Sequence, residues 1–202
     1  MPCPIAKGRV SILDLIVTPK SSSAIPVSNA LRRDLVIQAA LDPAVAGIEY
    51  VRTVPVGAAN YLFDGIVVVR DGTRHALEFQ HASVVRTLDL EGLRLLAIEK
   101  IEATPLSWTP TEVLREPRCT NARLIWECSR HRVRLDRRLG ILDSLDCWGA
   151  MPLRNFDAPR ADVFALACEA TVDVDLEAKD LDGALIRRSS RMPVPRPRIT
   201  GV

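Results

Sequence analysis

The feature that most restricts the fold is a pair of apolar runs joined by a turn, YLFDGIVVVRDGTRHALEFQ, from Tyr61 to Gln80. Val, Ile, Leu and Phe are frequent in both runs, which is typical of β-strands. Asp71-Gly72 between them predicts a hairpin turn, because Gly adopts positive φ without a steric penalty. Each run also contains a carboxylate, Asp64 in the first and Glu78 in the second. These acids are either solvated strand ends or a facing pair.

The register of the hairpin decides between these alternatives. If Arg70, Asp71 and Gly72 form a three-residue loop, Asp64 lies directly opposite Glu78 and Gln80 points the same way. A two-residue loop would instead pair Asp64 with the neighbour of Glu78 and place the two acids on opposite faces. We take the three-residue loop as the expectation.

Two facing carboxylates are unfavourable unless a cation lies between them. Their hard oxygen ligands suit Mg²⁺ or Mn²⁺, which retain waters and also bind phosphate oxygens. Such a metal ion activates a water for phosphodiester hydrolysis. The pattern therefore predicts a metal site formed by Asp64 and Glu78, with solvated strand ends as the alternative.

We predict a strand at 45–56 before the hairpin, with one helix before this strand and another after the hairpin. SNALRRDLVIQAALD predicts a helix capped by Ser28 or Asn29 and ended by Asp42-Pro43. VRTLDLEGLRLLAIEKIEA predicts a second helix, whose apolar side contains Leu90, Leu93, Leu96, Ala97 and Ile101. The expected fold is a mixed α/β core of helix, antiparallel or mixed sheet and helix, followed by a small, mainly helical C-terminal module.

We predict four segments along the chain. Residues 1–27 form an irregular lead-in, 28–133 the core, 134–186 the helical module and 187–202 a disordered basic Pro/Arg tail. The module could be a small winged-helix unit with VDVDL as its wing. Its acidic residues favour protein docking over phosphate contact.

Composition limits the partners. The chain has 202 residues, a net charge of +2 and no apolar run of membrane-spanning length, so we expect a cytoplasmic protein that does not cross a membrane. Arginines concentrate between residues 115 and 138, and such clusters suit DNA phosphates. The predicted DNA-binding residues are Arg115, Arg118, Arg123, Arg130 and Arg132. A solvated helix face is the alternative.

The order and spacing of NALRRDLVIQAALDPAV, LFDGIVVVRDGTRHALEFQ and LSWTPTEVLREPRCTNARLIW resemble the PD-(D/E)xK nuclease core. More narrowly, residues 28 to about 130 are similar to TnsA-like endonucleases of heteromeric transposases. The resemblance implies catalytic residues at Asp64, Glu78 and Gln80, with Mg²⁺ or Mn²⁺ on the two acids. It also implies DNA and a transposase or other mobile-element protein as partners.

The sequence departs from the family at two catalytic positions. Arg32 replaces the Glu of the first helix, and Gln80 replaces the Lys that orients or deprotonates the attacking water. Gln carries no charge and cannot act as a base. Lys100 could replace that lysine if its helix turned inward, although a surface position suits it better.

Three hypotheses follow. The chain is a weakened metal-dependent DNA endonuclease acting at transposon ends, or a catalytically silent DNA-binding or protein-docking descendant of one. The third is an unrelated α/β domain.

Overall fold

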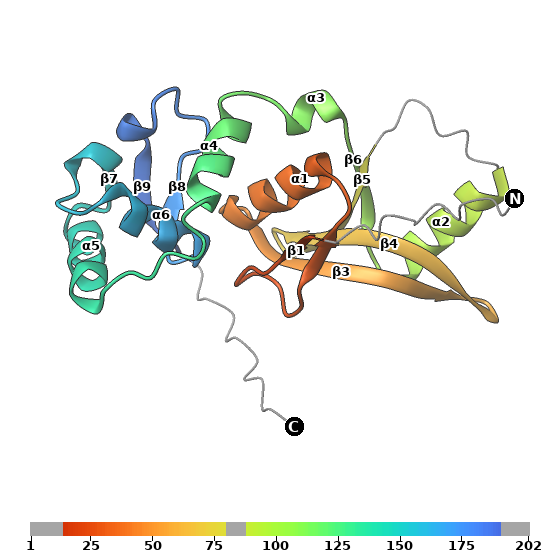
Figure 1. Cartoon of the computed structure of the whole chain (residues 1–202). Helices are drawn as coiled ribbons and strands as arrows, with labels where there is room; N and C mark the ends of the chain where they lie inside the picture. The colour runs from red at the N-terminus through yellow and green to blue at the C-terminus, as the bar shows by residue number, and fades with distance from the viewer. Residues whose placement is uncertain (1–13, 80–87, 191–202) are drawn as a thin grey trace, which may run out of the picture.

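The computed structural model describes residues 14–79 and 88–190 of the chain. These ranges contain three sheets, and the two with more than two strands lie side by side with their helices along the molecule (Figure 1). No helix within the described ranges has the length and apolarity needed to cross a membrane. The predicted mixed α/β class is confirmed.

The larger sheet has the order β3-β4-β5-β6. Strands β3 (Val45–Val56), β4 (Ala59–Arg70) and β5 (Thr73–Phe79) form an antiparallel meander. Helix α2 (Leu88–Lys100) then leads to β6 (Thr104–Trp108), which pairs in parallel with β5. This sheet and helix α1 (Ala30–Leu41) make up the predicted core.

Helix α1 follows its sequence signals closely. Asn29 caps it by accepting a hydrogen bond from the Arg32 backbone N–H at 2.8 Å, and Asp42 ends it. The helix buries nearly all its residues from Leu35 onward. Burial of this kind, more than intrinsic propensity, stabilises a helix in a globular protein.

Both faces of the central strands are covered. Ile66, Val68 and Leu77 belong to the main hydrophobic cluster together with residues of α1. Val67 and Ala76 are also fully buried but lie outside that cluster, as do Ala97 and Ile98 of α2. Since neighbouring strand residues point to opposite faces, α1 covers one face and α2 the other.

The predicted apolar side of α2 is largely exposed. Arg94 turns toward the sheet instead, where it pairs with Glu78 of β5, and it also binds Glu91 of its own helix at 2.5 Å. Among the α2 residues whose burial is described, 90–100, only Ala97 and Ile98 are buried. Large exposed side chains line the rest of the helix, at Leu90, Leu93, Leu95 and Leu96.

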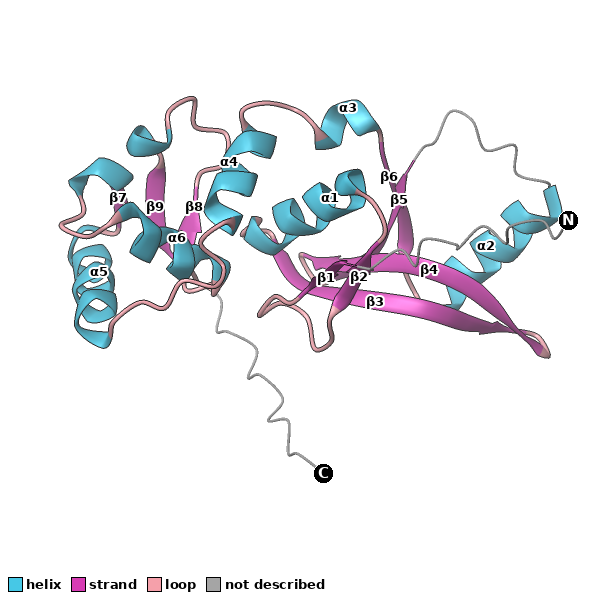
Figure 2. Ribbon diagram, in the orientation of Figure 1, coloured by secondary structure: helices cyan, strands magenta, loops and turns pink. Residues whose placement is uncertain are grey.

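The smaller sheet belongs to the C-terminal half and has the order β7-β9-β8 (Figure 2). Its strands are β7 (Ala150–Pro152), β8 (Val172–Val174) and β9 (Leu185–Arg188). Its helices are α4 (Arg118–Trp126), α5 (Leu135–Trp148) and α6 (Arg160–Cys168), and the four-residue α3 (Pro110–Val113) precedes them. One buried cluster extends from α1 through α4 to α6 and β9, so the two halves share a core.

Two predicted boundaries differ from the structure. Within the expected irregular lead-in, β1 (Asp14–Ile16) pairs with β2 (Ile25–Val27), because Ile16, Ile25 and Val27 enter the core. At the other end, Arg187 and Arg188 belong to β9 and are not part of a disordered tail. Residues 191–202 lie outside the described ranges.

Candidate metal site and basic surface

Asp64 lies at an irregularity of β4. The ladder with β3 shifts register between the pairs Val51–Gly65 and Thr53–Leu62. Asp64 itself has φ of 44°, in the left-handed region that Asp tolerates better than most residues. The bulge turns its side chain toward α1, and half of that side chain remains exposed.

Arg32 contacts Asp64 directly. Its Nη1 donates to Oδ2 of Asp64 at 3.2 Å, and its Nη2 donates to the Asp64 carbonyl at 3.1 Å. The guanidinium also lies over the ring of Tyr50, 5.8 Å from the centroid. Position 32, where the resemblance implies a catalytic Glu, therefore lies next to Asp64, and the Arg that occupies it forms an ion pair with Asp64.

Tyr50 completes this group from β3. Its hydroxyl donates to Oδ1 of Asp64 at 2.8 Å. Burial, together with this bond to a carboxylate, raises the pKa of Tyr50 above its usual value. Tyr50 therefore stays protonated and occupies a lone pair of Asp64 that a metal ion would otherwise use.

Glu78 has a separate cationic partner. Arg94 of α2 forms an ion pair with it, and both side chains are largely buried. Burial lowers the pKa of Arg94, because the charged form loses hydration. Glu78 and Asp64 thus pair with arginines from different helices.

The predicted register of the hairpin is wrong. Arg70 pairs with Thr73, so Asp71 and Gly72 form a two-residue loop with φ of 49° and 78°. Positive φ at both positions is typical of a type I′ turn, which matches the twist of the strands and favours Asp-Gly. Asp71-Gly72 favours this two-residue turn, whereas facing carboxylates would require a three-residue loop.

The two carboxylates consequently lie on opposite faces of the sheet. Leu77 packs into the cluster that contains α1, so its neighbour Glu78 points toward α2. Asp64 points toward α1. Among the residues that the structure describes, no three His, Cys, Asp or Glu side chains gather as a metal site.

Gln80 lies outside the described residues. Lys100 is exposed at the end of α2, as the surface interpretation expected.

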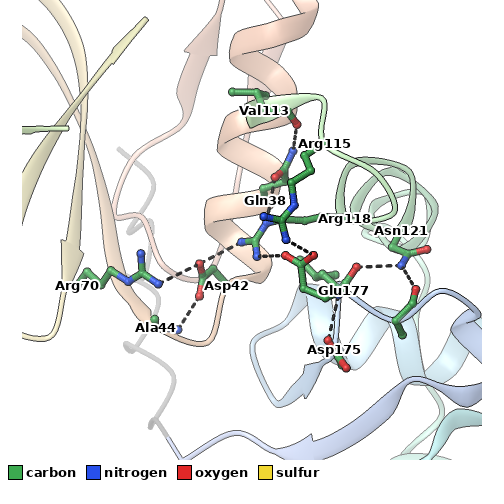
Figure 3. Close-up of polar contacts among 12 residues, drawn as sticks. Gln38, Asp42, Ala44, Arg70, Val113, Arg115, Arg118, Asn121, Asp175 and Glu177 are labelled. Carbon is green, nitrogen blue, oxygen red and sulfur yellow. Dashed lines mark hydrogen bonds and ion pairs between the residues drawn. The ribbon is translucent and has the colours of Figure 1, made fainter. Parts of the chain in front are cut away.

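Most of the predicted DNA-binding arginines have intramolecular acid partners. Arg115 and Arg118 bind Glu177 at 2.8 and 3.3 Å, and Arg118 also binds Asp42 at 3.1 Å (Figure 3). Arg123 donates to the buried Asp34 from Nε at 3.0 Å and from Nη2 at 2.5 Å. A hydrogen bond donated by Arg115 lowers the pKa of Glu177. The hydrogen bonds that Arg123 donates to Asp34 raise the pKa of Arg123.

Arg130 and Arg132 remain exposed, without an ion pair in the described part of the chain. Three of the five predicted residues therefore stabilise the fold, and two stay available to a phosphate.

Helix α6 has little surface for reading DNA. From Asp162 to Cys168 every residue is buried. Asp162 itself accepts from His131 at 2.6 Å and from Arg137 at 3.1 Å. Because a recognition helix must place exposed side chains in a groove, α6 cannot act as one in this arrangement.

The structure also adds residues that sequence reasoning missed. Arg94 and Asp34 complete two of the ion pairs, and Tyr50 adds a hydrogen bond to Asp64. The sequence signals of a changed site were Arg32 and Gln80, which differ from the residues that the resemblance implies at these positions, and neither identified these partners.

No family model matches the chain, and neither curated proteins nor solved structures give a match.

Proposed function

We propose that the chain is a catalytically silent descendant of a TnsA-like, PD-(D/E)xK nuclease, acting as a protein-docking subunit at mobile-element DNA ends. The observation that carries this proposal is the Arg32–Asp64 ion pair. It supports the motif alignment, because positions 32 and 64 meet in space. It also supports loss of cleavage, because a guanidinium takes the place of an acid and a metal ion.

The topology is consistent with that ancestry. A helix, a three-stranded antiparallel meander, a second helix and a strand parallel to the third follow one another, with a helix on each face. Fold alone does not establish function. The mobile-element context therefore depends on the resemblance of the sequence.

Three features support docking over cleavage. The retained acids are separated by the sheet and neutralised by Arg32 and Arg94. Most of the arginine cluster binds intramolecular acids. The exposed leucines of α2 resemble apolar patches that contact other proteins.

A plasmid-nicking assay tests the loss of cleavage. The purified chain should leave supercoiled DNA intact with either Mg²⁺ or Mn²⁺, and Asp64→Ala should behave identically. Metal-dependent nicking that disappears in Asp64→Ala would instead show that the chain is a weakened endonuclease. The missing catalytic charge would then come from outside the described residues.

A further inference from the structure

Helix α2 exposes leucines to solvent and holds an arginine against the sheet. Between positions 90 and 98, the charged residues in the sequence are Glu91 and Arg94. The Arg94 side chain is 15% exposed, and it binds Glu78 of β5 and Glu91 of its own helix. A surface helix of a globular protein ordinarily has the opposite arrangement, with its apolar stripe on the core and its charges in water.

The exposed leucines form an apolar surface at one end of the molecule. Helix α2 covers the larger sheet at the end away from the smaller sheet (Figure 1). Contiguous exposed apolar patches mark sites where another molecule binds. Glu99 and Glu102, exposed at the end of this surface, disfavour a lipid membrane, which attracts basic residues. The leucines concerned are 40–51% exposed and comprise Leu90, Leu93, Leu95 and Leu96.

The spacing of this surface fits a second copy of the same helix. Leu93 and Leu96 are three residues apart and are therefore neighbours on one face, and Lys100 continues their row one turn later. If two copies of α2 pack antiparallel about a two-fold axis midway between these leucines, Leu93 of each copy lies level with Leu96 of the other. Four leucines then meet at the centre, as apolar side chains do in the seam of a coiled coil.

The charges of α2 favour this antiparallel direction. The surface around Leu93 and Leu96 brings no like charges together, because Arg94 and Glu91 pair within the chain. Lys100 is exposed in the last turn, and in this register it is level with position 89 of the other copy, which is an Asp in the sequence. A parallel pair would instead place the two Lys100 side chains against each other, which is unfavourable.

We propose that the exposed face of α2 binds α2 of a second copy of this chain, antiparallel about a two-fold axis between Leu93 and Leu96, to form a symmetric homodimer. One patch then serves both copies, so the assembly closes at two chains. The proposal names the partner of the α2 surface and rests on the proposed function only for the docking role of that surface. Since α2 is about 20 Å long, one helix pair is small beside a standard interface of about 1,600 Å², and the dimer forms reversibly as concentration rises.

Analytical ultracentrifugation of the full-length chain tests the dimer. The average mass should rise with protein concentration from that of one chain toward that of two. Leu96→Glu should keep the protein monomeric, because it places a carboxylate against Leu93 of the other copy. Leu139→Glu, the same change at an exposed leucine of α5, is the matched control and should dimerise like the wild type. A wild type that stays monomeric at every concentration, or dimers that persist in Leu96→Glu, would overturn the proposal.

A charge exchange tests the direction of the two helices. Lys100→Asp should weaken the dimer several-fold, and adding Asp89→Lys should restore it. Eleven residues separate the two positions, about 16 Å along one helix, so they meet only between copies. A double variant as weak as Lys100→Asp would contradict the antiparallel arrangement. The plasmid-nicking assay measures the loss of cleavage separately, so either proposal can fail while the other holds.

Discussion

At the scale of single residues, Arg32 determines what the candidate site can do. Its guanidinium is 3.2 Å from Asp64, and its side chain is 10% exposed. A buried cation attached to the protein gives Asp64 the compensating charge that a metal ion would otherwise provide. The sequence showed Arg32 at the position where the resemblance implies a Glu. It could not predict the ion pair, because the two residues are far apart along the chain.

Asp162 illustrates a buried acid with a structural role. Burial raises its pKa, but the hydrogen bonds from His131 and Arg137 outweigh burial and leave the pKa below its usual value. A depressed folded-state pKa stabilises the protein above the unfolded pKa, and this stabilisation is lost as the pH falls through the folded value.

Asp162→Asn should therefore lower the free energy of unfolding by about 1–3 kcal/mol at pH 7. The difference from wild type should shrink below about pH 4, near the unfolded pKa of Asp. Urea unfolding at pH 7 and pH 3.5 measures both values. Asp136→Asn, which removes an exposed pair with Arg134, should cost less than about 1 kcal/mol. If Asp162→Asn lowered the free energy of unfolding equally at both pH values, the lowered pKa of Asp162 would be contradicted.

At the scale of elements, the sequence predicted order and type better than register. Helix α1, the three meander strands and α2 lie close to their predicted positions, since capping residues and apolar periodicity are local signals. The length of the turn decides to which face of the sheet each carboxylate points, because a register shift of one residue moves every side chain of the strand to the opposite face. The exposure of the α2 leucines depends on tertiary packing, which periodicity does not report.

The hairpin turn gives a prediction with an internal control. Gly72→Ala should cost about 1–2 kcal/mol, because Gly72 has φ of 78° and a Cβ is strained there. Gly92→Ala, in exposed helix α2 with open space around it, should stabilise by about 0.5–1 kcal/mol. Thermal or urea unfolding of both variants measures the two effects. A Gly72→Ala variant as stable as the wild type would contradict the positive φ of Gly72.

At the scale of the whole molecule, Arg118 connects the two halves. It donates to Gln38 at 3.1 Å and to Asp42 at 3.1 Å in the first half, and to Glu177 at 3.3 Å in the second (Figure 3). Nearby, Asn121 donates to the carbonyls of Leu176 and Ala178. From the arginine cluster that suggested DNA binding, Arg118 and Arg123 form this interface by binding Asp42 and Asp34. Composition could not reveal it, because the acid partners are distant in sequence.

Arg118→Ala should therefore destabilise the chain by about 2–4 kcal/mol, since Asp42 and Gln38 lose a partly buried donor. Arg115→Ala removes an exposed partner of the same Glu177 and should cost less than about 1 kcal/mol. Chemical unfolding of the two variants compares these costs directly. Similar losses in both would mean that Arg118 does not connect the halves.

The central claim is that Arg32 has replaced the metal ion, and calorimetric titration of Mn²⁺ tests it most directly. The wild type should release no heat of Mn²⁺ binding. The control variant Arg33→Glu, at the exposed position next to Arg32, should also release none. Arg32→Glu should bind Mn²⁺ through the new acid and Asp64, and the double variant Arg32→Glu/Asp64→Ala should lose that binding. Mn²⁺ binding by wild type that disappears in Asp64→Ala would contradict the account and indicate that the site still holds its metal.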